Sequence, residues 1–127
     1  MNKKYNILHL DDNPVFINIT RVLIENVNIN YEYAYYADDT YNALEKKLPD
    51  LLIVDLMLEN DYDPTPGMNF IKKINNIYPK LRIMVVTGNP DETLENKLKK
   101  YIIAYEQKGF DPPVFKDKVM NLLENNV

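Results

Sequence analysis

The chain of 127 residues contains no cysteine and no tryptophan, three glycines and a single histidine. Without cysteine there is neither a disulfide framework nor a thiolate metal ligand, and a reducing cytoplasm is compatible with this composition. No run of about 18 apolar residues occurs, and the N-terminal residues lack the apolar segment of a signal peptide, so we expect a cytoplasmic protein without a membrane span. The formal net charge of −4 argues against direct, nonspecific nucleic-acid binding.

What the chain does contain is one alternation of apolar patterns from end to end. Five short runs without helical period are predicted strands: residues 5–10, 31–37, 51–54, 82–86 and 103–107. Continuous apolar runs are typical of strands covered on both faces, whereas the tyrosine-rich second run favours a strand near an edge. The length suits a single domain over residues 1–127.

Helical patterns fill the gaps between these strands. The first helix is expected to begin with Asn13 as N-cap and Pro14 at the first helical position, the second to be capped by Asp38 or Asp39, and the fourth to open at Pro90. The five predicted apolar stripes are Phe16, Ile19, Leu23 and Val27; Tyr41, Leu44 and Leu48; Phe70, Ile71, Ile74 and Ile77; Leu94, Leu98 and Tyr101; and Phe115, Val119, Leu122 and Leu123. Strand and helix alternating five times predict an α/β fold with a doubly wound, five-stranded parallel sheet between helices.

Polar residues come directly after four of the predicted strands. Asp11 and Asp12 follow the first, Asp55 the third, Thr87 the fourth and Lys108 the fifth. In open α/β sheets, ligands bind outside the carboxyl ends of the strands, so these five side chains should meet at one rim.

This set of side chains indicates phosphoryl chemistry on a carboxylate. Three carboxylates brought together raise one another's pKa unless a cation joins them, and oxygen ligands suit Mg²⁺. A carboxylate beside Mg²⁺ can attack a phosphoryl group, while the metal and Lys108 neutralise the phosphoryl oxygens and Thr87 donates a hydrogen bond to them.

From about Tyr5 to Leu123, the sequence resembles a response-regulator receiver domain of two-component signalling, of the single-domain, CheY-like kind. The motifs that carry the resemblance are the acidic pair Asp11-Asp12, Asp55 in Ile53-Val54-Asp55-Leu56-Met57, Thr87 in Val85-Val86-Thr87-Gly88, and Lys108. The resemblance implies a flavodoxin-like fold with strand order 2-1-3-4-5 and five flanking helices.

The resemblance also implies a role for each matched residue. Asp55 would be the phosphoacceptor and a Mg²⁺ ligand, Asp12 and the backbone carbonyl of Met57 would bind Mg²⁺ directly, and Asp11 would assist, often through water. Thr87 and Lys108 would serve catalysis.

A signalling role follows from the same resemblance. Thr87 and Tyr105 would form a switch that alters the face of helix four, strand five and helix five. The donor would be a sensor histidine kinase or histidine phosphotransfer protein, and the output a downstream target protein, with the domain acting as a monomer or a phosphorylation-linked dimer.

Two features depart from the family pattern. Gly109 follows Lys108 where the family commonly has proline, so we expect a trans bond there, with glycine accommodating a changed backbone that bears on how Lys108 is aimed. The loop of residues 58–67 reaches Gly67 a few residues later than usual, and its acidic stretch of residues 59–63 is hypothesised to gate the site or contact a partner.

The same residues allow other interpretations. His9 is expected to be structural, without a phosphotransfer role, and Tyr105 is either a mobile switch or a fixed packing aromatic. The alternative function is a receiver-like protein-interaction module that works without phosphorylation. A haloacid-dehalogenase-type phosphatase needs a second aspartate where this chain has Met57, and a flavodoxin would not place Asp11 and Asp12 against a flavin phosphate. Beyond its own phosphorylation and dephosphorylation, no conventional enzyme activity is expected.

Overall fold

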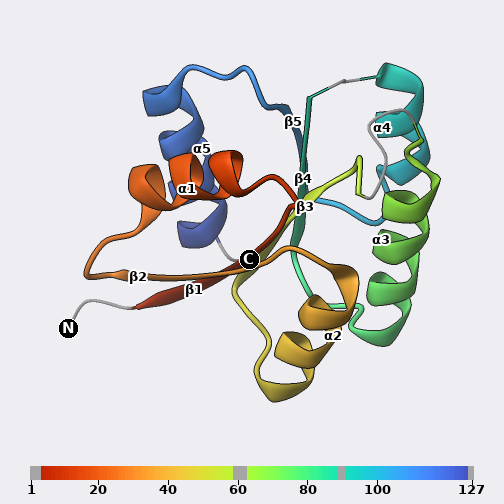
Figure 1. Ribbon diagram of the computed structural model, residues 1–127, viewed down its shortest axis with the longest axis horizontal. Helices are drawn as coiled ribbons and strands as arrows, with labels where there is room; N and C mark the ends of the chain where they lie inside the picture. The colour runs from red at the N-terminus through yellow and green to blue at the C-terminus, as the bar shows by residue number, and fades with distance from the viewer. Residues whose placement is uncertain (1–3, 59–62, 89–90, 126–127) are drawn as a thin grey trace.

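The computed structural model describes residues 4–58, 63–88 and 91–125. A five-stranded parallel sheet in the order β2-β1-β3-β4-β5 forms its middle layer. Helices α1 and α5 cover one face of the sheet, and α2, α3 and α4 cover the other (Figure 1). The predicted doubly wound α/β fold is therefore confirmed.

Strands and helices alternate throughout the described chain. The strands are β1 (Tyr5–Leu10), β2 (Ile29–Ala34), β3 (Leu51–Asp55), β4 (Ile83–Thr87) and β5 (Ala104–Gln107). The helices are α1 (Pro14–Ile24), α2 (Ala37–Lys46), α3 (Thr65–Ile77), α4 (Glu92–Leu98) and α5 (Pro112–Glu124). No helix in the three described ranges is long and apolar enough to cross a membrane.

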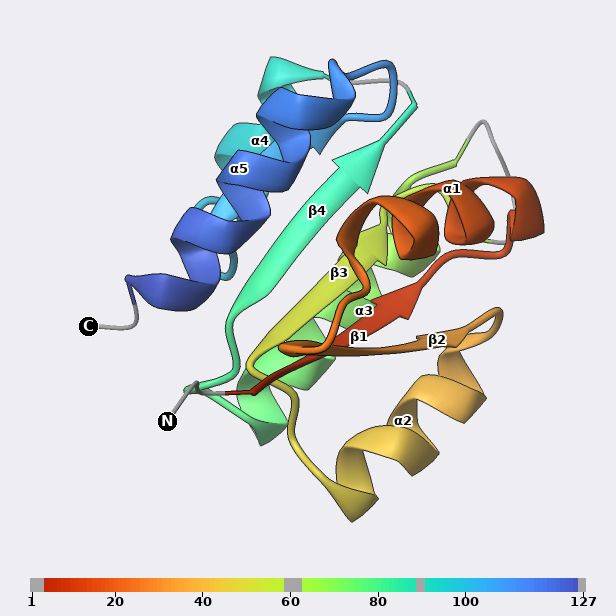
Figure 2. The same ribbon diagram turned by 90° about the vertical axis from the view of Figure 1, so that its left-hand side faces the viewer.

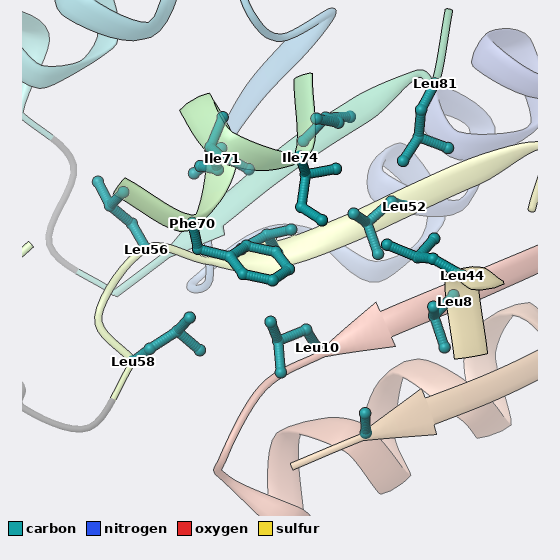
Figure 3. Packing of buried hydrophobic residues seen from close by; sticks show 14 of the residues in the cluster. Leu8, Leu10, Leu44, Leu52, Leu56, Leu58, Phe70, Ile71, Ile74 and Leu81 are labelled. Carbon is teal, nitrogen blue, oxygen red and sulfur yellow. The ribbon is translucent and has the colours of Figure 1, made fainter. Parts of the chain in front are cut away.

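The middle strands are buried on both faces, as their continuous apolar runs predicted. Every residue of β3 and β4 is buried, because α1 and α5 pack on one side and α2, α3 and α4 on the other. Figure 3 shows the core on the side of α2, α3 and α4, where Phe70 of α3 points toward Leu10 of β1 and Ile74 of α3 points toward Leu52 of β3. The sheet is therefore held from both sides, and the carboxyl ends of its strands are fixed relative to one another.

Several predicted boundaries were wrong by a few residues. β2 covers Ile29–Ala34 rather than residues 31–37, although it does lie at an edge of the sheet. α2 begins after Tyr36, without a capping side chain, so Asp38 and Asp39 lie in its first turn and not at its cap. Carboxylates are favourable in the first turn as well as at the cap, so the sequence did not distinguish the two.

The face of α1 was also predicted only in part. Its buried residues are Phe16, Ile17, Thr20 and Ile24. Ile19, from the predicted stripe, is 49% exposed, and Val27 lies beyond the end of the helix. The helix carries apolar residues on more than one face, so periodicity alone did not determine which face meets the sheet.

Smaller differences concern the ends of other stripes. Leu48 lies after α2 and Tyr101 after α4, because both helices are shorter than their apolar periodicity. Ile77 is half exposed at the end of α3, and Leu122 of α5 is half-buried. Asp91 caps α4 by accepting a hydrogen bond from the Thr93 N–H, whereas Pro90 lies outside the described residues.

Candidate functional site

The carboxyl ends of the strands meet at one edge of the sheet. The arrowheads of β1, β3 and β4 point toward the same edge in Figure 2. The register pairs Leu10 of β1 with Val54 of β3, so Asp11 and Asp55 follow at adjacent positions. Because parallel strands share a direction, consecutive β–α connections deliver their first polar residues to one place.

The other half of the rim comes from β4 and β5. The register pairs Asp55 with Val86, so Thr87 lies one residue farther along β4, where it is fully buried. The Lys108 N–H donates to the Thr87 carbonyl at 2.9 Å, which extends the β4–β5 ladder by one bond. Lys108 therefore leaves β5 beside Thr87 and turns its side chain toward the carboxylates.

Asp11, Asp12 and Asp55 form a tight acidic group. One carboxylate oxygen from each lies within 4.8 Å of the other two. Asp11 and Asp55 are buried, whereas Asp12 is exposed and opens the group to solvent. The expectation that separate strands bring these three carboxylates together is met.

The two buried carboxylates are held in the same manner. Oδ1 of Asp11 accepts the Asn13 N–H at 2.9 Å, and Oδ1 of Asp55 accepts the Met57 N–H at 3.1 Å. Lys108 Nζ lies between their other oxygens, 2.9 Å from Oδ2 of Asp11 and 3.2 Å from Oδ2 of Asp55. The backbone thus orients one oxygen of each carboxylate, and the ammonium takes the other.

Gly109 does not misdirect Lys108. A Cβ placed on Gly109 would meet no atom within 4 Å, and its φ is outside the left-handed region. The backbone at residue 109 therefore does not require glycine, and Lys108 reaches both aspartates. The Nζ atom of Lys108 also lies over the Phe16 ring, 4.6 Å from its centre, so the ring packs against the charged end of this side chain.

The charges of the site are unbalanced. Burial, and next the charge of Asp55, raise the pKa of Asp11 to about 6. Partial burial acts to lower the pKa of Lys108, but its hydrogen bonds and charge interactions with Asp11 and Asp55 outweigh this and raise it above the usual range. One ammonium facing three carboxylates leaves an excess of negative charge when all are ionised.

The donor set fits a hard divalent cation. All three groups offer carboxylate oxygens, which Mg²⁺ prefers, and Asp12 keeps an approach open to water. Oδ2 of Asp11 is buried, and it shares the Lys108 ammonium with Asp55. A cation would therefore offset the free-energy cost of burying the Asp11 charge, which Lys108 alone compensates only in part.

Tyr105 is half-buried, and its hydroxyl is engaged with the start of α4. The hydroxyl accepts the Asp91 N–H at 3.3 Å and lies 3.5 Å from the Asp91 carbonyl, to which it donates. The ring packs against the core on the α3 and α4 side of the sheet. Tyr105 thus links β5 to the cap of α4 on the side of the molecule away from α1.

Gly67 lies beside the site, and no pattern in the sequence explains why this residue is glycine. It is the third residue of α3, and a Cβ there would lie 2.1 Å from the Leu56 carbonyl oxygen. Only glycine lets α3 approach the segment between Asp55 and Met57 this closely. Residues 59–62, which are four of the five residues for which a gating role was hypothesised, lie outside the described residues.

His9 lies beneath the acidic group and is fully buried. Its Nδ1 is 2.6 Å from the Tyr31 hydroxyl, and its Nε2 is 4.0 Å from Oδ2 of Asp11. Burial, and to a smaller extent the charge of Lys108, lowers the pKa of His9 to about 3, so the ring is neutral. Sequence reasoning assigned this residue a structural role and had no signal for its approach to Asp11.

The profile of the response regulator receiver domain family matches residues 7–120 of this chain. The chain belongs to that family. No curated protein matches the receiver domain significantly. Among solved structures, it is similar to a response regulator from Thermotoga maritima, with a TM-score of 0.84 and 18% identity over 96% of this chain and 99% of that one.

Two further structures share the fold. The signal receiver domain of an HD domain-containing protein from Pseudomonas fluorescens Pf-5 has a TM-score of 0.83 and 22% identity, covering 99% of this chain and 91% of that one. A CheY-like receiver domain protein from Methanospirillum hungatei JF-1 has a TM-score of 0.82 and 21% identity, covering 98% and 97%. These neighbours confirm the flavodoxin-like strand order 2-1-3-4-5.

Proposed function

We propose that this receiver domain is a phosphorylation switch whose phosphoacceptor is Asp55. The observation that carries the proposal is the convergence of three carboxylates within 4.8 Å, two of them contacted by Lys108 Nζ. A binding module without phosphorylation has no need to bury two ionisable carboxylates and an ammonium together, because burying charge is costly.

The transfer proceeds by attack of an Asp55 carboxylate oxygen on the phosphorus of a partner phosphohistidine. An O–P bond forms, the N–P bond breaks, and the imidazole leaves with its electron pair and takes a proton from solvent. Lys108 lies 3.2 Å from Asp55 and supplies positive charge to the incoming phosphoryl oxygens. Thr87, buried beside Asp55 at the end of β4, donates a hydrogen bond from its hydroxyl to the phosphoryl group once that group is in place.

Asp11, Asp12, Asp55 and the Met57 carbonyl would hold Mg²⁺. When bound, Mg²⁺ offsets the charge of the carboxylates and phosphoryl oxygens, so that the two anions can approach. Met57 is suited to this arrangement because its N–H already binds Oδ1 of Asp55, which places its backbone at the site.

The output is a change at the face of α4, β5 and α5. Tyr105 is the switch residue that accompanies Thr87, and its bonds to Asp91 are the contacts that a rotation would break. The partners are a sensor histidine kinase or histidine phosphotransfer protein and a downstream target protein, and the single domain of residues 1–127 acts in the cytoplasm as a monomer or phosphorylation-linked dimer.

Incubation with acetyl phosphate tests the proposal. The intact mass should increase by one phosphoryl group in wild type and in Asp117→Asn, an exposed control on α5, but not in Asp55→Asn or without Mg²⁺. If wild type neither gains mass nor binds Mg²⁺, the chain is instead an interaction module that works without phosphorylation.

A further inference from the structure

The neighbourhood of His9 suggests a role beyond packing. Its ring is held edge-on by two aromatic side chains, Phe16 at a centroid distance of 5.7 Å and Tyr31 at 5.9 Å. The Tyr31 hydroxyl at Nδ1 fixes the ring from one end, and at the other end Nε2 is buried and has no hydrogen-bond partner in the described part of the chain. This unpartnered nitrogen points toward Oδ2 of Asp11, 4.0 Å away.

Two arrangements of protons are open to the His9–Tyr31 pair. Either His9 Nδ1 donates to the Tyr31 oxygen and the hydroxyl donates to the Ile17 carbonyl at 3.4 Å, or the hydroxyl donates to His9 Nδ1 at 2.6 Å. The Asp11 carboxylate, 4.0 Å from Nε2, favours the second arrangement. Nδ1 is then the acceptor and Nε2 carries the ring proton. The opposite tautomer would turn the lone pair of Nε2 toward the Asp11 carboxylate, which is repulsive.

Asp11 needs a second donor because Lys108 is shared. In the structure, Oδ2 of Asp11 depends on Lys108 Nζ at 2.9 Å, and the same ammonium contacts Asp55. During phosphoryl transfer, the ammonium is drawn to the phosphoryl oxygens. Oδ2 of Asp11 would then be a buried oxygen that accepts no hydrogen bond from the protein, with only a bound cation to offset its charge, and this costs free energy.

We propose that His9 is a positioning residue of the site, whose Nε2–H takes over Oδ2 of Asp11 when Lys108 turns to the phosphoryl group. The inference rests on the proposed function of Asp55. The present 4.0 Å separation is about 1 Å longer than an N–H···O hydrogen bond, and hydrogen bonds at a catalytic site often shorten only when the reacting groups are bound. His9 neither accepts nor donates the phosphoryl group.

The tautomer can be read directly, because His9 is the only histidine in the chain. Long-range ¹H–¹⁵N correlation spectra of ¹⁵N-labelled protein at pH 7 should show a protonated Nε2 and an unprotonated Nδ1. Tyr31→Phe should disturb this preference, whereas Tyr33→Phe, an exposed tyrosine on the same strand, should leave it intact. A proton on Nδ1 in the wild-type protein would overturn the inference.

The second measurement is the rate of phosphorylation by acetyl phosphate at saturating Mg²⁺. His9→Phe keeps an aromatic ring but removes the donor, and we expect a loss on the order of tenfold, as for outer-shell partners of other metal sites. His9→Gln, whose amide can donate from about the position of Nε2, should recover part of the rate. Tyr33→Phe should react like wild type.

The outcomes separate the two proposals. If wild type is phosphorylated and His9→Phe reacts equally fast, the His9 inference is wrong and the function of Asp55 stands. If wild type neither takes a phosphoryl group nor binds Mg²⁺, the proposed function fails and the role of His9 in transfer fails with it. The spectra are recorded on the wild-type protein, so they can refute the inference even if His9→Phe does not fold.

Discussion

Among single residues, Asp11 shows most clearly that the acidic group lowers the stability of the folded protein when it is ionised. Its carboxylate is buried beside Asp55, and it is oriented by the Asn13 N–H and by Lys108. Burial disfavours its charged form, and the neighbouring carboxylate disfavours it further. The proposed binding of Mg²⁺ requires this group to be ionised, and without a cation the folded protein bears the free-energy cost of that charge.

The pH dependence of stability should show this cost. The folded-state pKa of Asp11 is about 6, above its ordinary value of 3.8, so the group favours folding while it is protonated. This contribution is fully present below about pH 3.8 and is lost as the pH rises through about 6. In Asp11→Asn, which is neutral throughout, the contribution does not change with pH.

We therefore expect Asp11→Asn to gain stability relative to wild type by about 1–3 kcal/mol between pH 4 and pH 7.5. Urea unfolding of both proteins in EDTA, at the two pH values, measures the difference. A difference between the two proteins that is the same at both pH values would show that Asp11 is not held at a raised pKa.

At the scale of elements, the approach of α3 to the end of β3 shapes the site. The helix begins at Thr65, whose N–H is accepted by the Asp63 carboxylate, and Gly67 then passes against the Leu56 backbone. Because Leu56 connects Asp55 to Met57, the position of α3 affects the backbone that orients Asp55, the proposed phosphoacceptor. The chain offers a matched glycine, Gly109, that has no such contact.

Alanine at these two glycines should have opposite effects. Gly67→Ala would place a methyl group 2.1 Å from the Leu56 carbonyl oxygen, and we expect a loss of about 1–3 kcal/mol in the free energy of unfolding, with slower phosphorylation. Gly109→Ala meets open space and should be neutral or stabilising by up to about 1 kcal/mol. Chemical denaturation and the acetyl phosphate assay measure both effects, and equal stability of the two variants would contradict the close approach of α3.

At the scale of the whole molecule, cation binding to the acidic group would be coupled to folding. The three carboxylates come from the ends of two separate strands, so their grouping exists only in the folded protein. A cation that binds this group stabilises the folded state by mass action.

Mg²⁺ should therefore raise the melting temperature. At a concentration ten times its dissociation constant, the gain is about 1.4 kcal/mol, or roughly 5 °C for a domain of this size. Asp12→Asn should lose most of the shift, whereas Asp117→Asn should keep it. A shift that persists in Asp12→Asn would place the Mg²⁺ elsewhere on the protein.

Much of this architecture followed from sequence alone, for reasons visible in particular residues. The apolar runs of β3 and β4 have no helical period, so they predicted strands buried on both faces. Asn13 and Pro14 predicted the start of α1 correctly, because a capping side chain followed by proline is a local signal. Asp11, Asp12, Asp55, Thr87 and Lys108 could be assigned to one rim because parallel strands deliver their carboxyl ends to the same edge.

Tertiary structure decided what depends on contacts between distant elements. α1 buries Ile17 and Thr20 and leaves Ile19 outside, because packing against β1 and α5 selects one of several apolar faces. Gly67 is required by the Leu56 carbonyl, which no local pattern reveals. The placement of His9 Nε2 near Asp11 depends on Tyr31 from the neighbouring strand, since a hydrogen bond across 22 residues of sequence forms only when the sheet has brought both ends together.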